Sequence, residues 1–138
     1  MDMQLSDKLA LVTGSTAGIG YAIALGLAQE GASVIITGLT DDKVQSAVQS
    51  IHEKTGATVY GYTGNIGEYS NAQMLLNKHP KIDILVNSLG VYESKLFEDL
   101  EDADWLRMFE INVMSGVRLS RLCLPAMKSA SQLQAIGC

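Results

Sequence analysis

The sequence of 138 residues has little cysteine and no excess of basic residues. Its two cysteines, Cys123 and Cys138, have neither the spacing of a disulfide framework nor that of a metal site. We therefore expect reduced thiols and no bound metal. Ten lysines and arginines stand against fifteen aspartates and glutamates, so the net charge is −5. This balance argues against nucleic acid or an anionic membrane as the main partner.

Long apolar runs are also absent. No stretch approaches the length of a membrane span, and residues 1–4 lack the basic start of a secretion signal, so we expect a cytoplasmic protein. Disorder is not expected either, because 47% of the residues are hydrophobic. The length suits one domain, and the sequence shows no repeat or linker.

A glycine-rich stretch at residues 13–20, TGSTAGIG, carries the strongest functional signal. It follows a short apolar run and precedes apolar positions at helical spacing. Gly14 would permit a tight turn, while Gly18 and Gly20 would let the backbone approach a pyrophosphate. The amide groups and positive dipole end of the helix would then face the phosphates. The stretch predicts a dinucleotide-binding unit, and a tight strand–helix turn without a ligand is the alternative.

The spacing of these glycines is specific. It differs from G-x-G-x-x-G and, because no lysine follows Gly20, from the phosphate loop G-x-x-x-x-G-K-[ST]. It matches T-G-x-x-x-G-x-G, and in this the chain resembles the short-chain dehydrogenase/reductase family. The resemblance implies NAD or NADP as the cofactor. It also implies that the cofactor is held by Gly14, Ser15, Thr16, Gly18, Ile19 and Gly20.

Apolar runs that alternate with helical periods predict a Rossmann-like α/β fold with a doubly wound parallel sheet. The resemblance implies the strand order 3-2-1-4 and a single NAD(P)-binding domain over residues 1–138. Strands are expected near 8–12, 32–37, 57–62 and 82–86. Helices are expected after the glycine turn, from about 41 to 55, at 68–78 and at 102–128.

The end of the second expected strand bears on the choice of cofactor. An acid about 20 residues beyond the glycine turn binds the ribose hydroxyls of NAD, and an arginine nearby accommodates the phosphate of NADP. Leu39 stands at this place. Asp41 and Asp42 come slightly late and suit the first turn of the next helix, where acids complement the dipole. The preference between NAD and NADP stays open.

Two later strand ends complete the expected cofactor site. The resemblance places Asn65 and Ile66 at the adenine, although the family usually has an acid where Asn65 stands. A carbonyl acceptor is retained there, and a loop asparagine favoured for its turn geometry is the alternative. Asn87 and Gly90 lie in Asn-Ser-Leu-Gly, which is similar to the family's Asn-Asn-Ala-Gly. They are expected to border the cofactor.

The segment 102–128 is apolar around most of its circumference, so as a helix it needs cover on more than one side. The resemblance implies a helix-to-helix subunit interface, hence a homo-oligomer or another association through this helix. Asn112 is a poor choice for a helix interior, because its side chain competes with the backbone for hydrogen bonds. The resemblance makes Asn112 a catalytic residue that opens the helix locally and holds a water. A tolerated polar residue is the alternative.

The other catalytic residues of the family do not appear. Complete relatives use a serine and a Tyr-x-x-x-Lys pair, in which the lysine lowers the pKa of the tyrosine. None of the five tyrosines has a lysine four places on, and residues 129–138 depart from the family pattern. We therefore expect a C-terminally truncated domain whose fourth strand is an open apolar edge.

The resulting functional expectation is the NAD(P)-binding portion of an oxidoreductase. Complete relatives reduce carbonyls or oxidise alcohols by hydride transfer, and this chain alone is expected to be inactive. A non-catalytic nucleotide-binding or partner-docking protein is the alternative.

Overall fold

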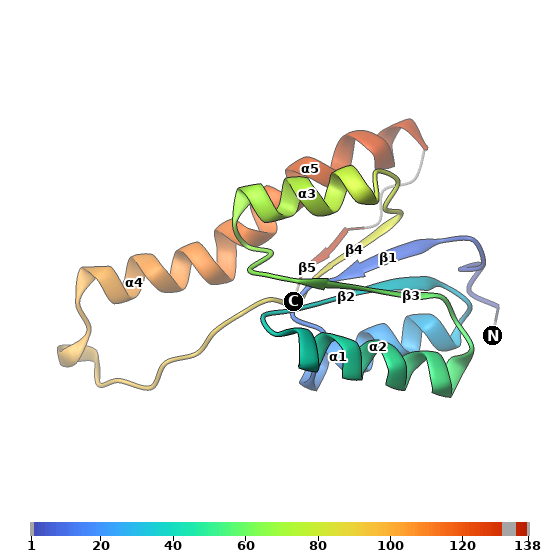
Figure 1. Cartoon of the computed structure of the whole chain (residues 1–138). Helices are drawn as coiled ribbons and strands as arrows, with labels where there is room; N and C mark the ends of the chain where they lie inside the picture. Colours follow the sequence, from blue (N-terminus) through green and yellow to red (C-terminus); the bar gives the residue numbers. More distant parts are fainter. Residues whose placement is uncertain (1, 131–134, 138) are drawn as a thin grey trace.

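The computed structural model describes residues 2–130 and 135–137, which form a parallel sheet with helices on both faces (Figure 1). The strands are β1 (Leu9–Val12), β2 (Ser33–Gly38), β3 (Val59–Thr63), β4 (Ile84–Asn87) and β5 (Ala135–Gly137). The helices are α1 (Gly18–Gln29), α2 (Asp41–Thr55), α3 (Tyr69–Lys78), α4 (Asp102–Phe109) and α5 (Ser115–Ser129). A 3-10 turn (Phe97–Asp99) precedes α4, and a π-helical turn (Glu110–Met114) joins α4 to α5.

The strands lie in the order β3-β2-β1-β4-β5, and all neighbouring pairs are parallel. The central strand β1 pairs on both sides, with Leu11 opposite Ile35 of β2 and Leu85 of β4. The predicted order of the first four strands is confirmed. The direction of winding reverses between β1 and β4, which is where ligands bind in folds of this kind.

Alternate residues of the strands meet different helices, as the two-residue period of a strand requires. On one face, side chains such as Val12 and Ile36 pack with α1 and α2. On the other, Leu11, Ile35 and Leu85 pack with α3 and α5. Because both faces are covered, the strands are almost continuously apolar, which explains why the sequence revealed them as unbroken hydrophobic runs.

The short strand β5 corrects one expectation. The sequence analysis expected β4 to be an open edge, but residues 135–137 pair with 85–87 along it. Strand pairing uses backbone N–H and C=O groups, so it does not depend on the side-chain pattern that the sequence analysis did not find in residues 129–138. The expectation of an open edge along 85–87 was therefore wrong.

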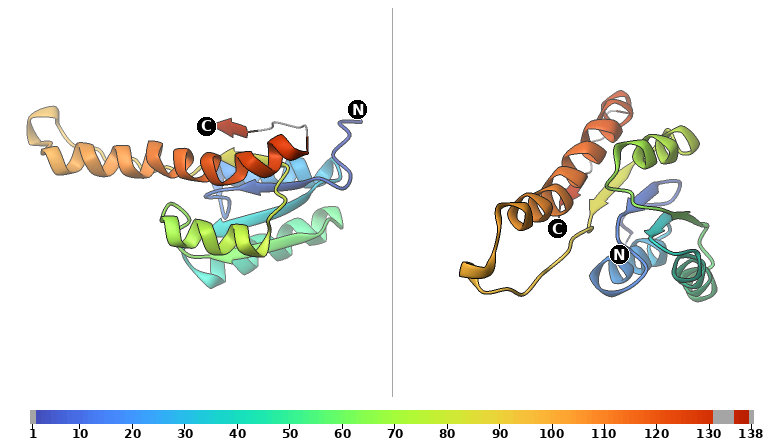
Figure 2. Two further views of the ribbon diagram at one scale, coloured as in Figure 1. Left: turned by 90° about the horizontal axis from the view of Figure 1, so that it is seen from above. Right: turned by 60° about the vertical axis from the view of Figure 1, so that its left-hand side comes forward.

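Residues 91–114, here called the arm, extend beyond the sheet (Figures 1 and 2). The arm contains an extended loop, the 3-10 turn, α4 and the π-helical turn. No residue of α4 or of the π-helical turn is buried, whereas α5 buries four residues against the sheet side. The segment predicted as one helix at 102–128 is therefore helical throughout but differs sharply in burial along its length. None of the helices in the described residues is long and apolar enough to cross a membrane.

Candidate functional site

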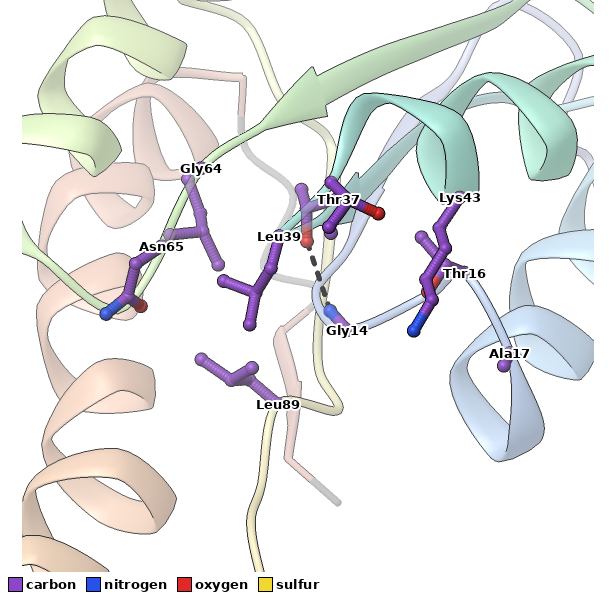
Figure 3. Close-up of a pocket in the computed structure, with 12 residues that line it drawn as sticks. Gly14, Thr16, Ala17, Thr37, Leu39, Lys43, Gly64, Asn65 and Leu89 are labelled. Atoms are coloured by element: carbon purple, nitrogen blue, oxygen red, sulfur yellow. Dashed lines mark hydrogen bonds between the residues drawn. The ribbon is translucent and has the colours of Figure 1, made fainter.

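Two adjoining hollows lie at the carboxyl ends of β1 to β4. The first hollow has a volume of about 350 Å³ and is formed by the segments that follow all four strands (Figure 3). The second hollow, of about 500 Å³, shares Gly14, Ala17 and Leu89 with the first and extends toward Asn112. Together they form one groove, here called the switch-point groove, across the position where the winding reverses.

The glycine turn after β1 is tied to β2. The amide of Gly14 donates to Oγ1 of Thr37 over 3.1 Å, which is the dashed line in Figure 3. The hydroxyl of Ser15 donates to the carbonyl of Val12 over 2.6 Å and accepts from the amide of Thr37 over 3.0 Å. Ser15 is fully buried and lines neither hollow, so it shapes the turn rather than the groove surface.

The start of α1 packs directly on this turn. A Cβ at Gly20 would lie 2.4 Å from the carbonyl oxygen of Gly14, so only glycine permits this close approach. Gly18 has φ +62°, and a Cβ there would meet no heavy atom within 4 Å. The backbone at Gly18 therefore faces open space, while Ile19 beside it is exposed and lines the second hollow.

Within the part of the chain that the structure describes, no side chain caps the first turn of α1. Ala17 is the N-cap residue in extended conformation, and no acidic residue lies in the first turn. Helices normally satisfy these first N–H groups with a capping side chain, water or a ligand. Because Ala17 and Gly20 line the groove, the positive end of the α1 dipole opens into it. An anionic group such as a diphosphate fits this place.

The segment after β2 supplies the only charged side chain among the described residues that line the first hollow. Leu39 is 73% exposed and lies at the hollow, as does Thr16. Lys43, in the first turn of α2, also lines it, and its side chain runs toward the glycine turn (Figure 3). Sequence reasoning considered Asp41 and Asp42 of this turn but not Lys43, whose place at the hollow depends on how α2 packs.

Asn65 and Ile66 after β3 both line the first hollow. The side-chain oxygen of Asn65 accepts a bond of 3.1 Å from the amide of Gly67, which is the turn geometry considered as the alternative for this residue. Asn71 supports the same loop by donating to the carbonyl of Asn65 over 2.9 Å. Arg118 of α5 also holds it, through a bond of 3.2 Å to the carbonyl of Gly67.

The segment after β4 divides into two parts. Gly90 lines the second hollow, but Asn87 lines neither hollow and instead donates from Nδ2 to Oγ of Ser120 over 3.3 Å. Asn87 therefore braces β4 against α5, and its buried Oδ1 has no hydrogen-bond partner among the described residues. Thr13, which the sequence analysis quoted but did not select, accepts bonds of 3.0 Å from the amides of Ser88 and Leu89. It joins the loop after β4 to the glycine turn.

Asn112 lies in the π-helical turn, so the predicted local opening of the helix is confirmed. Its side chain forms a two-bond clamp on Val91. Nδ2 donates to the carbonyl over 3.0 Å, and Oδ1 accepts from the amide over 2.8 Å. A Cβ at Gly90 would lie 2.8 Å from this Oδ1, which explains the glycine. Asn112 thus joins the arm to the second hollow, while its catalytic role stays a prediction.

A charged pair supports this π-helical turn. Arg118 pairs with Glu110, and their hydrogen bond, opposed in part by desolvation, lowers the pKa of the Glu110 carboxyl below its ordinary value. Because Arg118 also donates to the carbonyl of Gly67, it connects the turn that carries Asn112 with the loop that carries Asn65.

The parallel sheet, the close glycine turn and the groove at the reversal of winding define a doubly wound α/β domain of the nucleotide-binding class. Residues 8–136 match the model of the family described as short chain dehydrogenase. The chain belongs to this family. The match includes residues 129–136, most of the segment that the sequence analysis separated from the family pattern.

Relatives with known names include oxidoreductases. The chain is 44% identical over 122 residues to the uncharacterized oxidoreductase YvaG of Bacillus subtilis, covering 88% of this chain and 46% of that protein. It is 36% identical over 117 residues to the 3-oxoacyl-[acyl-carrier-protein] reductase FabG of Aquifex aeolicus. This match covers 82% of this chain and 47% of that reductase. The chain thus spans about half the length of these relatives.

A solved structure shows the same arrangement. L-Sorbose reductase from Gluconobacter frateurii, in complex with NADPH and L-sorbose, superposes with a TM-score of 0.91 at 32% identity. The superposition covers 99% of this chain and 54% of the reductase.

Proposed function

We propose that this chain binds NAD or NADP along the switch-point groove and forms the cofactor-binding half of an oxidoreductase. The observation that carries the proposal is the uncapped start of α1, which opens into a groove at the reversal of winding. The presence of NADPH in the superposed L-sorbose reductase supports the same ligand class. The reaction we infer is hydride transfer that interconverts a carbonyl and an alcohol, as the reductases among the relatives suggest.

Each part of the groove has a distinct task in this proposal. The amide groups at the start of α1 bind the diphosphate. The first hollow, with Leu39 and Ile66 in its lining, holds the adenosine. The second hollow, with Ile19 and Asn112, receives the other half of the cofactor. The bound nicotinamide supplies or accepts the hydride, and we assign to Asn112 the positioning of a water nearby.

We also infer that the chain associates with another copy through α4, the π-helical turn and α5. The support is a set of exposed apolar side chains on these elements, which include Trp105, Leu106, Phe109, Val113 and Val117. Exposed apolar surface of this kind marks interaction sites. Sedimentation at micromolar concentration tests the association, and a monomer would contradict it.

We place the protein in the cytoplasm. Cys123 of α5 is buried in the core, and burial raises the pKa of its thiol to about 11. Such a thiol is uncharged at neutral pH and shielded from oxidation, which suits a reducing compartment. Cys138, the other expected thiol, lies outside the described residues.

The function is tested by changing Ala17, the N-cap of α1, to Asp. A carboxylate here would cap the helix and add about 1 kcal/mol to the free energy of unfolding. The same carboxylate would repel a diphosphate by about 4 kcal/mol at 4 Å and an effective dielectric constant of 20. We therefore expect a stable Ala17→Asp variant that binds NAD and NADP at least roughly tenfold more weakly than wild type.

Ala17→Ser is the matched control, because a serine caps the helix without adding charge. Calorimetric titration measures the affinities, and thermal unfolding with and without dinucleotide provides a second reading. Ligand at about 100 times its Kd raises the free energy of unfolding by about 2.7 kcal/mol. Unchanged affinity in Ala17→Asp, or no response of the wild type to either dinucleotide, would overturn the proposal.

A further inference from the structure

Lys43 stands out among the residues around the switch-point groove. Its side chain crosses from the first turn of α2 toward Thr16 and the glycine turn (Figure 3). Within residues 2–130 and 135–137, Lys43 has no ion-pair or hydrogen-bond partner. The Lys43 ammonium group borders the hollow and is therefore available to bind an anionic group of a ligand.

Lys43 follows β2 on the ribose side of the groove, and its side chain reaches from there toward the glycine turn. Its neighbours in the first hollow are Leu39 and Thr40, which directly follow β2. In doubly wound folds this strand end meets the adenine ribose, where an acid binds the 2′-hydroxyl of NAD or a basic residue accommodates the 2′-phosphate of NADP. The diphosphate belongs instead at the start of α1.

The surrounding charges favour a phosphate over a hydroxyl. No carboxylate lines the first hollow among the described residues, so the hydroxyls of NAD would find no acidic acceptor. Asp41 and Asp42 occupy the first turn of α2, and Asp42 lines a neighbouring hollow together with Lys43, Thr16 and Ala17. These acids reduce the local positive potential. They do not replace a carboxylate at position 39, which would accept hydrogen bonds from the ribose hydroxyls of NAD.

From this arrangement we infer that the groove selects NADP over NAD, with Lys43 contacting the 2′-phosphate. The inference rests on the proposed dinucleotide function and specifies its ligand. A phosphate monoester carries between about 1.5 and 2 negative charges at neutral pH, a charge that NAD lacks at the ribose. Lys43 therefore discriminates by attraction to NADP, and Leu39 by giving NAD no hydrogen-bond acceptor.

The test compares the affinities of NADPH and NADH for wild type, Lys43→Gln and Lys78→Gln. Lys78 is an exposed lysine at the far end of α3, so its substitution makes the same change in charge away from the groove. We expect wild type to bind NADPH at least roughly tenfold more tightly than NADH, as a charged hydrogen bond can provide. The Lys43→Gln substitution should lower the affinity for NADPH about tenfold and leave the affinity for NADH unchanged. The Lys78→Gln substitution should change neither affinity.

Two probes without nicotinamide locate the contact. Adenosine 2′,5′-bisphosphate carries the 2′-phosphate, whereas adenosine 5′-monophosphate does not. Only the first should bind more weakly to Lys43→Gln. A circular dichroism melt confirms that each variant is folded.

The outcomes separate this inference from the proposed function. Tighter binding of NADH than of NADPH by wild type would overturn the selectivity and leave dinucleotide binding intact. If Lys43→Gln lowered the affinities for NADPH and NADH equally, Lys43 would lie at the diphosphate, and the inference would also be overturned. Binding of neither nucleotide by folded wild type would overturn the proposed function itself.

Discussion

The body of the molecule and its arm are held together in different ways. In the body, β1 to β4 lie between α1 and α2 on one face and α3 and α5 on the other, with Leu11, Ile35 and Leu85 fully buried. The arm has comparable apolar side chains, but Trp105 is 54% exposed and Leu106 is 69% exposed. Apolar content therefore does not create a core unless a second layer covers it.

Polar contacts give the arm its shape instead. Glu101 and Asp104 form a capping box at the start of α4, and Lys95 pairs with Asp104 over 3.3 Å. Asn112 clamps Val91 at the base of the arm. Such contacts at an exposed surface contribute little individually. The body therefore covers its own apolar side chains, whereas the arm leaves many of its apolar side chains exposed.

The largest expected effect comes from removing buried volume in the body. Leu85→Ala deletes a fully buried side chain between β4 and the α3–α5 layer, so it should lower the free energy of unfolding by about 2–5 kcal/mol. Urea denaturation measures the change.

Leu106→Ala makes the same substitution on the arm and is the matched control. It should change the unfolding free energy of the monomer by less than about 0.5 kcal/mol. Similar losses for the two variants would show that Leu106 is buried in solution and would remove the contrast between body and arm.

A smaller effect is expected where arm and body meet. Asn112→Ala removes both bonds to Val91, so the loop should open more easily, by about 1 kcal/mol of local free energy. Hydrogen exchange of the Val91 amide should accelerate about fivefold, while amides of β1 stay unchanged.

Asn112→Asp is the graded control, because its oxygen can still accept from the amide of Val91 but its carboxylate cannot donate. The exchange rate of the Val91 amide in Asn112→Asp should lie between the rates in wild type and in Asn112→Ala. Unaltered exchange in Asn112→Ala would mean that other contacts hold the loop.

The smallest effect concerns pH at the Glu110–Arg118 pair. Because Arg118 lowers the pKa of Glu110 in the folded state, the pair stabilises above the ordinary pKa of a glutamate. This stabilisation is lost as the pH falls through the lowered value. Solvent screens an exposed pair, so the change should be detected locally rather than in global unfolding.

Carboxyl titration by NMR measures this effect. Glu110 should titrate at lower pH in wild type than in Arg118→Met, where the hydrogen bond is absent. Equal titration in both proteins would contradict the pairing. Buried contacts of the body, such as those of Leu11, should be insensitive over the same range.

Much of this fold could be predicted from the sequence because its signals are local. The apolar run at residues 8–12 and the period of Val44, Ala47 and Ile51 predict elements that the structure contains, with Gly56 in the left-handed conformation at the end of α2. A local opening of the helix at Asn112 was also expected, from the family resemblance, and the structure has a π-helical turn there.

The directions of the side chains at the groove were harder to predict from the sequence than the helices and strands were. Asn87 was expected at the cofactor but contacts Ser120, which lies 33 positions away in sequence. Ser15 was expected at the same site but turns inward to the backbone of β1 and β2. Sequence spacing placed both residues at the correct strand ends, but it could not show which neighbour each side chain meets.

By itself, the sequence determined the types of element, their order and the close turn at Gly14, Gly18 and Gly20. These depend on periodicity and on the room that a missing Cβ leaves, which are properties of short segments. Only the tertiary structure decided that Lys43 borders the first hollow and that residues 135–137 complete the edge of β4. Such placements depend on which distant segments come together, and this is settled by packing around the common core.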